Sequence, residues 1–128
     1  MENDVEKKIA LLIDCDNAHS DSIHGIMEEL AKHGIVNVRR AYGNWKKNPQ
    51  GWEKHLHPFA INPVQQFAYT EGKNATDIAM TIDAMELLYS EPIDIFARLY
   101  SYSGLVATSS STSERSSAFP RRRTLCTN

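Results

Sequence analysis

Several features that would place this chain in a special class are scarce or missing. Its 128 residues hold two cysteines, Cys15 and Cys126, and neither lies in a CxxC or Cys/His zinc spacing. Neither a disulfide framework nor a structural metal is therefore indicated. No apolar run approaches the roughly 20 residues that a membrane helix needs. The segment MENDVEKK lacks the apolar core of a signal peptide. We therefore expect one domain in the cytoplasm, with no membrane partner.

Charge and serine content divide the chain into two parts. Residues 1–97 carry 9 Lys/Arg and 15 Asp/Glu, whereas residues 98–128 carry 5 and 1. The second part also holds 8 serines in 31 residues, where the first 97 residues hold 3. This composition predicts a domain over residues 1–105 and a disordered Ser/Arg-rich tail over residues 106–128.

Strand-like and helix-like patterns alternate along the first part. The continuous apolar run at 8–14 suits a central parallel strand that is buried on both faces. The remaining strands are predicted over 35–43, 63–69 and 93–97, and helices over 23–31, 51–59 and from about Thr76. The last helix is predicted to bury a stripe of Ala75, Ala79, Ile82, Met85 and Tyr89. This order predicts an α/β fold with a three-layer, Rossmann-like parallel sheet of about four strands.

Oxygen-bearing side chains follow the ends of two predicted strands. Asp14 ends the first strand, Asp16 and Asn17 follow it, and Asp77 lies in the first turn of the last helix, after Lys73. Ligands bind outside the carboxyl ends of parallel strands, so these groups are expected to share one pocket. Separated carboxylates suit Mg²⁺, which takes oxygen ligands together with substrate phosphate. The predicted metal ligands are the three aspartates, with the lysine stabilising negative charge.

Structural explanations stand beside these functional ones. Asp16 or Asn17 could cap the first helix, and Asp77 could bind the first-turn amides of its own helix. Asp14 is harder to explain in this way, because a carboxylate that ends a buried strand loses its hydration. Asp83 follows Asp77 by six residues, about 240° further round the helix, so it is a second-tier candidate.

Basic and aromatic residues alternate in the segment RRAYGNWKKNPQGW at 39–52. Phosphate contacts and base stacking make Arg39, Arg40, Trp45, Lys46 and Lys47 candidates for binding nucleic acid. Equally, the two tryptophans of this segment could pack the short helix onto the sheet. Because the first part of the chain is acidic overall, any nucleic-acid footprint must be local.

Four pieces of the sequence, in order, resemble one known family. ALLIDCDNA, RRAYGNW, EGKNATDIAMTIDAM and IDIFA resemble the NYN domain, a branch of the PIN-like nuclease superfamily, in its bacterial LabA-like form. The resemblance covers residues 7 to about 105 and implies a metal-dependent ribonuclease that hydrolyses RNA with Mg²⁺ or Mn²⁺. It implies catalytic roles for Asp14 and Asn17, and its GK-x-x-x-D pattern matches Lys73 and Asp77. We expect RNA as the partner, single-stranded or structured, and leave a homo-oligomer open.

The resemblance breaks after the strand at 93–97. The family usually continues with a Ser-Ser-Asp-Ser-Asp-Phe type motif that completes its acidic cluster, but Tyr102 and Gly104 stand at the two Asp positions here. This departure implies an incomplete C-terminal part, weaker metal binding and impaired activity. A shift of reading frame near Gly104 would explain it: codons such as GGA CTT GTC GCC ACT AGT, read one nucleotide later, give Asp-Leu-Ser-Pro-Leu-Val, which resembles the family's continuation.

Two other functions compete with the nuclease. A non-catalytic RNA-binding or interaction module would keep the sheet and the Trp/Lys loop. A haloacid-dehalogenase-type phosphatase would use Asp14 as nucleophile and Asp16 as acid, but it requires a later lysine and a further acidic pair that this chain does not offer.

Overall fold

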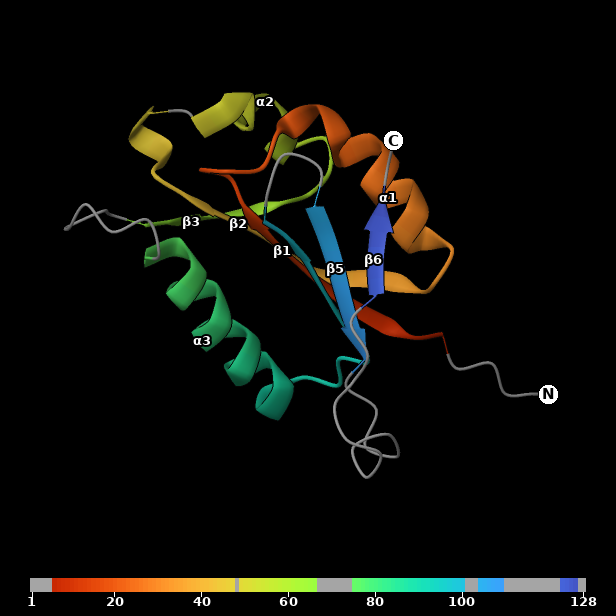
Figure 1. The fold of residues 1–128 in the computed structure, drawn as a ribbon. Coiled ribbons are helices and arrows are strands. Elements are labelled where there is room, and N and C mark those ends of the chain that lie inside the picture. The colour runs from red at the N-terminus through yellow and green to blue at the C-terminus, as the bar shows by residue number, and fades with distance from the viewer. Residues whose placement is uncertain (1–5, 48, 67–74, 101–103, 110–122, 127–128) are drawn as a thin grey trace.

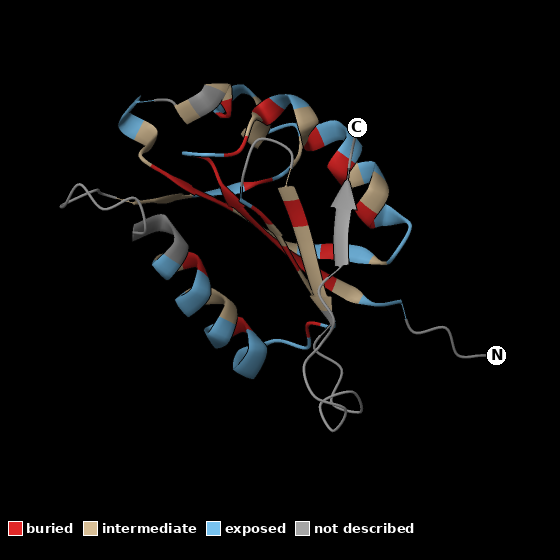
Figure 2. Ribbon diagram, in the orientation of Figure 1, coloured by how far each residue is buried: buried red, intermediate tan, exposed pale blue. Residues whose placement is uncertain are grey.

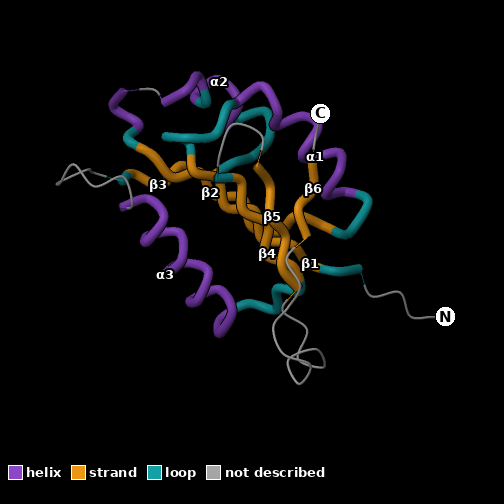
Figure 3. Tube along the Cα trace, viewed as in Figure 1, coloured by secondary structure: helices purple, strands orange, loops and turns teal. Residues whose placement is uncertain are grey.

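Helices cover both faces of one β-sheet. The computed structural model describes residues 6–47, 49–66, 75–100, 104–109 and 123–126. The strands are β1 (Lys8–Asp14), β2 (Ile35–Gly43), β3 (Asn62–Gln65), β4 (Ile95–Leu99), β5 (Gly104–Ser109) and β6 (Arg123–Cys126). The helices are α1 (Ile23–Ala31), α2 (Glu53–Leu56) and α3 (Ala75–Ser90), with 3-10 turns η1 (Ser20–Ser22), η2 (Trp45–Lys47) and η3 (Pro49–Gly51). Helices α1 and α2 lie on one side of the sheet and α3 on the other (Figures 1 and 3).

The sheet is parallel through its first four strands. Its strand order is β3-β2-β1-β4-β5-β6, and β1 pairs in parallel with both β2 and β4. Asp14 lies opposite Tyr42 of β2, and Ile13 lies opposite Leu99 of β4. The carboxyl ends of these strands therefore meet at one edge, and the predicted α/β fold with its parallel sheet is confirmed.

Strand β1 is the centre of the core because its side chains alternate between two apolar layers. Ile9, Leu11 and Ile13 pack with residues of α1 and with Trp52, whereas Ala10 and Leu12 pack with residues of α3. Figure 2 shows the buried residues concentrated along this strand. The apolar run at 8–14 is therefore explained as the sequence predicts, by burial of the strand on both faces.

The turn between α1 and β2 depends on a glycine. A Cβ atom at Gly34 would lie 2.2 Å from the backbone oxygen of Lys7, which also accepts a 2.8 Å hydrogen bond from the amide of Ile35. The chain approaches the start of β1 so closely here that no side chain fits. Glycine is therefore required at position 34, where the chain passes from the end of α1 into β2.

The buried face of α3 differs from the prediction. Met80 and Leu87 are buried against the sheet, whereas Ile82, Met85 and Tyr89 are exposed and Ala79 is half-buried. The side chain of Ala75 lies outside the described residues. The predicted stripe is wrong because apolar side chains occupy every side of this helix, so their spacing alone did not select the inner face.

The tail also differs from the prediction. Part of the segment predicted to be disordered over 106–128 forms β5 and β6, so the described residues give the sheet six strands rather than four. Strand β5 pairs antiparallel with β4, and Leu105 lies fully buried opposite Leu99. The composition of residues 98–128 as a whole predicts disorder, but the short run GLVATS within it contains β-branched residues that suit a strand.

Smaller differences concern element lengths. The helix predicted over 51–59 spans only Glu53–Leu56, and the strand predicted over 63–69 is Asn62–Gln65, with residues 67–69 outside the described part of the chain. Of the helices that the structure describes, none combines the length and the apolar character needed to span a membrane.

Candidate active site

A buried carboxylate stands at the carboxyl edge of the central strand. The side chain of Asp14 is 3% exposed and ends β1. Its Oδ2 accepts a 2.9 Å hydrogen bond from Nδ2 of Asn17, and its Oδ1 accepts a 3.1 Å hydrogen bond from the amide of Asp16. The loop that follows the strand therefore fixes the orientation of the carboxylate.

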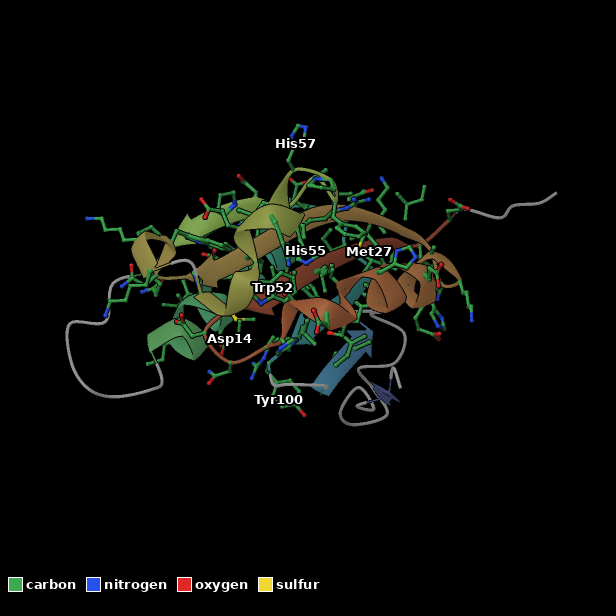
Figure 4. All side chains as sticks on the ribbon, turned by 90° about the horizontal axis from the view of Figure 1, so that it is seen from above. Asp14, Met27, Trp52, His55, His57 and Tyr100 are labelled. Atoms are coloured by element: carbon green, nitrogen blue, oxygen red, sulfur yellow. The ribbon has the colours of Figure 1, made fainter. Side chains whose placement is uncertain are left out.

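Trp52, a core residue, holds this loop by a hydrogen bond (Figure 4 shows the position of Trp52 relative to Asp14). The indole is fully buried, and its Nε1 donates a 2.8 Å hydrogen bond to the backbone oxygen of Ala18. The amide of Ala18 in turn donates a 2.8 Å hydrogen bond to the backbone oxygen of Asp14. For Trp52 the packing alternative is confirmed, since its ring supports the site from the core.

Neither Asp16 nor Asn17 caps a helix. The residue that precedes α1 is Ser22, and η1 is capped by His19, whose ring accepts from the amide of Asp21. The capping alternative for these two side chains is therefore wrong. Both instead belong to the site loop, Asn17 through its bond to the carboxylate of Asp14.

Asp16 reaches toward the neighbouring strand. A Cβ atom at Gly43, the last residue of β2, would lie 3.4 Å from Oδ1 of Asp16 and 3.3 Å from Cβ of Cys15. The carboxylate of Asp16 thus lies at the same edge of the sheet as that of Asp14. Glycine at position 43 leaves the space that this loop occupies.

Cys15, between the two aspartates, belongs to the core. Its side chain is fully buried in the core. Burial, reinforced by the charges of Asp14 and Asp16, raises the pKa of the thiol above its ordinary value of 9.0. The thiol stays protonated at neutral pH and behaves as the small buried hydrophobe that the sequence predicts.

The structure describes only part of the other half of the predicted site. Helix α3 begins at Ala75, so Asp77 lies in its first turn as predicted, but the side chain of Asp77 lies outside the described residues. Lys73 and Tyr102 lie outside them entirely. Gly104 is the first residue of β5, and its backbone oxygen accepts a 3.1 Å hydrogen bond from the amide of Tyr100. The convergence of Asp77 and Lys73 on Asp14 stays a prediction.

Asp83 joins α3 to the second strand. The hydroxyl of Tyr42 donates a 2.5 Å hydrogen bond to Oδ2 of Asp83, and Nη1 of Arg40 lies 3.3 Å from the same oxygen. Burial and then the bond to Asp83 raise the pKa of Tyr42 above its ordinary value of 10.0. The sequence analysis did not predict this cluster. The available signal is the spacing of Arg40 and Tyr42, which are two residues apart and so lie on the same face of a strand.

The predicted nucleic-acid residues do not form a single surface. Arg39 donates to the backbone oxygens of Val36, at 3.1 Å, and Phe59, at 2.7 Å, whereas Arg40 turns to the opposite face and Asp83. Nε1 of Trp45 donates to the backbone oxygen of Val64 at 3.1 Å. The lysines of η2, Lys46 and Lys47, are exposed.

The edge offers oxygen donors of the type that hard divalent ions prefer. Both carboxylate oxygens of Asp14 face the loop at this edge, where each accepts a hydrogen bond, and Asp16 adds a second carboxylate. Within the described part of the chain, no group of three His, Cys, Asp or Glu side chains could hold a metal ion. A third protein ligand would have to come from residues beyond that part, such as the side chain of Asp77.

A parallel α/β sheet with an oriented acid at the end of its first strand is consistent with the PIN-like class of nuclease domains. The sequence matches the NYN domain family over residues 8–103. The chain therefore belongs to the NYN domain family, whose members are PIN-like nuclease domains that act on RNA and generally depend on divalent metal ions. A search of curated proteins and a search of solved structures each returned no match.

Proposed function

We propose that this chain is a metal-dependent RNA nuclease domain of the LabA-like group that hydrolyses phosphodiester bonds with Mg²⁺ or Mn²⁺. The observation that carries this proposal is the carboxylate of Asp14, which is 3% exposed yet stands at the carboxyl edge of the central strand. A buried carboxylate costs free energy unless it is hydrogen-bonded or binds a cation. The loop supplies hydrogen bonds to both of its oxygens and a second carboxylate nearby.

The described residues would position the reaction rather than perform it alone. Asn17 and the amide of Asp16 hold the carboxylate of Asp14 in one orientation, and Trp52 holds the loop that carries them. A divalent ion bound there would polarise the phosphate and lower the pKa of the attacking water. In this proposal Lys73 stabilises the negative charge that develops on the phosphate.

The direction of α3 supports Asp77 as the next ligand. Asp83 bonds to Tyr42, which lies opposite Asp14 at the end of its strand. Asp77 precedes Asp83 by six residues, or about 9 Å along the helix axis. Because a crossover helix runs antiparallel to the strands it connects, this step leads toward the carboxyl edge. The first turn of α3 is therefore expected above the site.

Lys46 and Lys47 are the proposed contacts to the RNA backbone, since both are exposed beside the end of β2. Arg39, Arg40 and Trp45 make hydrogen bonds within the domain, so we propose that they stabilise the fold rather than contact RNA. Phosphate contacts by two lysines would make RNA binding weaker as salt is added.

The region after β4 favours a second candidate, a non-catalytic RNA-binding module. At Gly104, where the resemblance places the second Asp of the family's acidic motif, the chain begins a strand that pairs antiparallel with β4. The sheet thus changes from parallel to antiparallel pairing at the residue where we propose a shift of reading frame. The gene sequence tests this part: a +1 frame downstream of Gly104 that meets early stop codons would rule it out.

RNA cleavage separates the two functions. Purified full-length protein is incubated with end-labelled single-stranded RNA and Mn²⁺, alongside Asp14→Asn and a matched control, Asp94→Asn. Asp94 bonds to the amide of Lys8 at the opposite end of the sheet, so its substitution makes the same chemical change away from the site. Cleavage by the wild type and the control, lost in Asp14→Asn, supports the nuclease. RNA binding without cleavage supports the module, and cleavage that survives Asp14→Asn contradicts the proposed site.

A further inference from the structure

The outer face of α3 carries a row of large apolar side chains that no described residue covers. Ile78, Ile82, Met85 and Tyr89 are 58%, 52%, 55% and 84% exposed, and we call these four residues the outer stripe. On the opposite side of the same helix, Met80 is fully buried against the sheet. A helix that is apolar on two opposite faces is typical of one that is buried on both.

The spacing of the outer stripe is that of a helix pair. Its members are separated by four, three and four residues, the a/d pattern with which one helix packs along another. At about 100° per residue they lie within roughly 60° of one another on the helix surface. The occupant that fits such a narrow seam is another helix rather than a strand or a loop.

The same spacing favours a second copy of this chain as the occupant. Four, three and four residues read the same in both directions, so the stripe is symmetric about a point between Ile82 and Met85. A two-fold axis through that point would pair α3 with an antiparallel α3, which is the self-complementary arrangement that a symmetric dimer requires. Ile82 would then contact Met85 of the second copy, and Ile78 would contact Tyr89 of the second copy.

The residues beside the stripe are compatible with this pairing. In the antiparallel arrangement Glu86 would lie opposite Thr81 of the second copy, so these flanking positions bring no like charges together. The helix carries Asp83 on its inner side, bound to Tyr42 and away from the stripe. The described part of the proposed nuclease site, the loop at Asp14, Asp16 and Asn17, lies at the carboxyl end of β1 rather than on α3.

The exposed area is enough for a small dimer. The outer stripe and the adjoining Leu88, 48% exposed, offer roughly 600 Å² per copy, which is as large as the largest apolar patch on a typical monomer. Two copies would bury roughly 1,200 Å², at the lower limit of standard interfaces. We propose that the outer stripe pairs α3 with α3 of a second copy in a two-fold, antiparallel dimer.

The test measures the mass of the full-length protein by sedimentation equilibrium between about 1 and 200 µM, the range that suits an interface of this size. The wild type is compared with Ile82→Lys and with Ile35→Lys. Ile35 lies on β2 and is 50% exposed, so it matches Ile82 in residue type and exposure outside the stripe. Circular dichroism of each variant reports whether it folds.

A double variant tests the register. In Ile82→Lys/Met85→Glu the new lysine faces the new glutamate of the second copy only if the helices are antiparallel, whereas a parallel pair would face like charges. We expect a wild-type dimer, a dissociation constant raised about a hundredfold or more by Ile82→Lys, an unchanged dimer in Ile35→Lys and recovery in the double variant. A monomeric wild type at 200 µM, a dimer that tolerates Ile82→Lys, or a folded double variant that stays monomeric would each overturn the proposal.

Discussion

The substitution Tyr42→Phe tests whether the hydrogen bond between Tyr42 and Asp83 fastens α3 to the sheet. The change removes one hydroxyl from a fully buried ring and leaves the ring's packing in place. Asp83 loses a 2.5 Å donor but keeps Arg40 at 3.3 Å. The effect on stability should therefore isolate the bond itself.

The expected loss of unfolding free energy follows from the charge on the hydrogen-bond acceptor, the carboxylate of Asp83. Hydrogen bonds to charged groups contribute about 1.5–3 kcal/mol to the free energy of unfolding. Because Arg40 remains and Asp83 is only partly buried, we expect a value near the lower half of this range, about 2 kcal/mol. With an m-value of about 2 kcal/mol/M, the urea midpoint would fall by about 1 M.

Equilibrium urea unfolding at pH 7 measures this change. Tyr100→Phe is the matched control, since it removes the same hydroxyl from an exposed side chain outside the outer stripe, and it should shift the midpoint by less than about 0.2 M. A double-mutant cycle with Asp83→Asn should show a coupling energy of about 1–2 kcal/mol. A midpoint for Tyr42→Phe within about 0.2 M of the wild type would refute the reasoning.

Four further predictions concern the core and the site loop. The free energy of unfolding should fall as pH rises past 9.0 and then 10.0, because the unfolded chain releases the protons of Cys15 and Tyr42 that the folded chain retains. Urea unfolding measured across this pH range should show a smaller fall in stability near pH 9 for Cys15→Ala than for the wild type. Leu105→Ala should lower stability by about 2–4 kcal/mol if β5 belongs to the core, whereas a disordered tail would leave the urea midpoint unchanged. Trp52→Phe should destabilise the fold by about 2 kcal/mol or more, since it removes the bond to Ala18 and much of a buried ring; an unchanged melting temperature would contradict this. Gly43→Ala should lower cleavage more than stability, because its Cβ would crowd Cys15 and Asp16, and assays of both on one preparation compare the two effects.

Local patterns predicted the parts of this fold that local physics determines. The apolar run at 8–14 has one stable environment, a strand buried on both faces, so β1 and the position of Asp14 at its end could be predicted. The pattern at 35–43 likewise gave the bounds of β2 without error. Since parallel strands share a carboxyl edge, the place of Asp14 followed from these two strands.

Features that depend on contacts distant in the sequence could not be predicted. The bond between Tyr42 and Asp83 joins residues 41 positions apart, and neither side chain signals the other. The inner face of α3 was predicted wrongly because apolar residues surround the helix, and only its position on the sheet decides which of them are buried. Strand β5 was not predicted because its stability comes from pairing with β4, and the composition of a segment does not reveal such a pairing.

The central claim is that Asp14 is a ligand in a metal-dependent RNA nuclease. The most direct measurement is the single-turnover rate constant for cleavage of a labelled single-stranded RNA in Mn²⁺, with Asp14→Asn compared with Asp94→Asn. We expect Asp94→Asn to match the wild type, and Asp14→Asn to be slower by a factor of at least about 100, as the loss of an interaction that stabilises the transition state predicts. Equal rate constants for the two folded variants would contradict the claim.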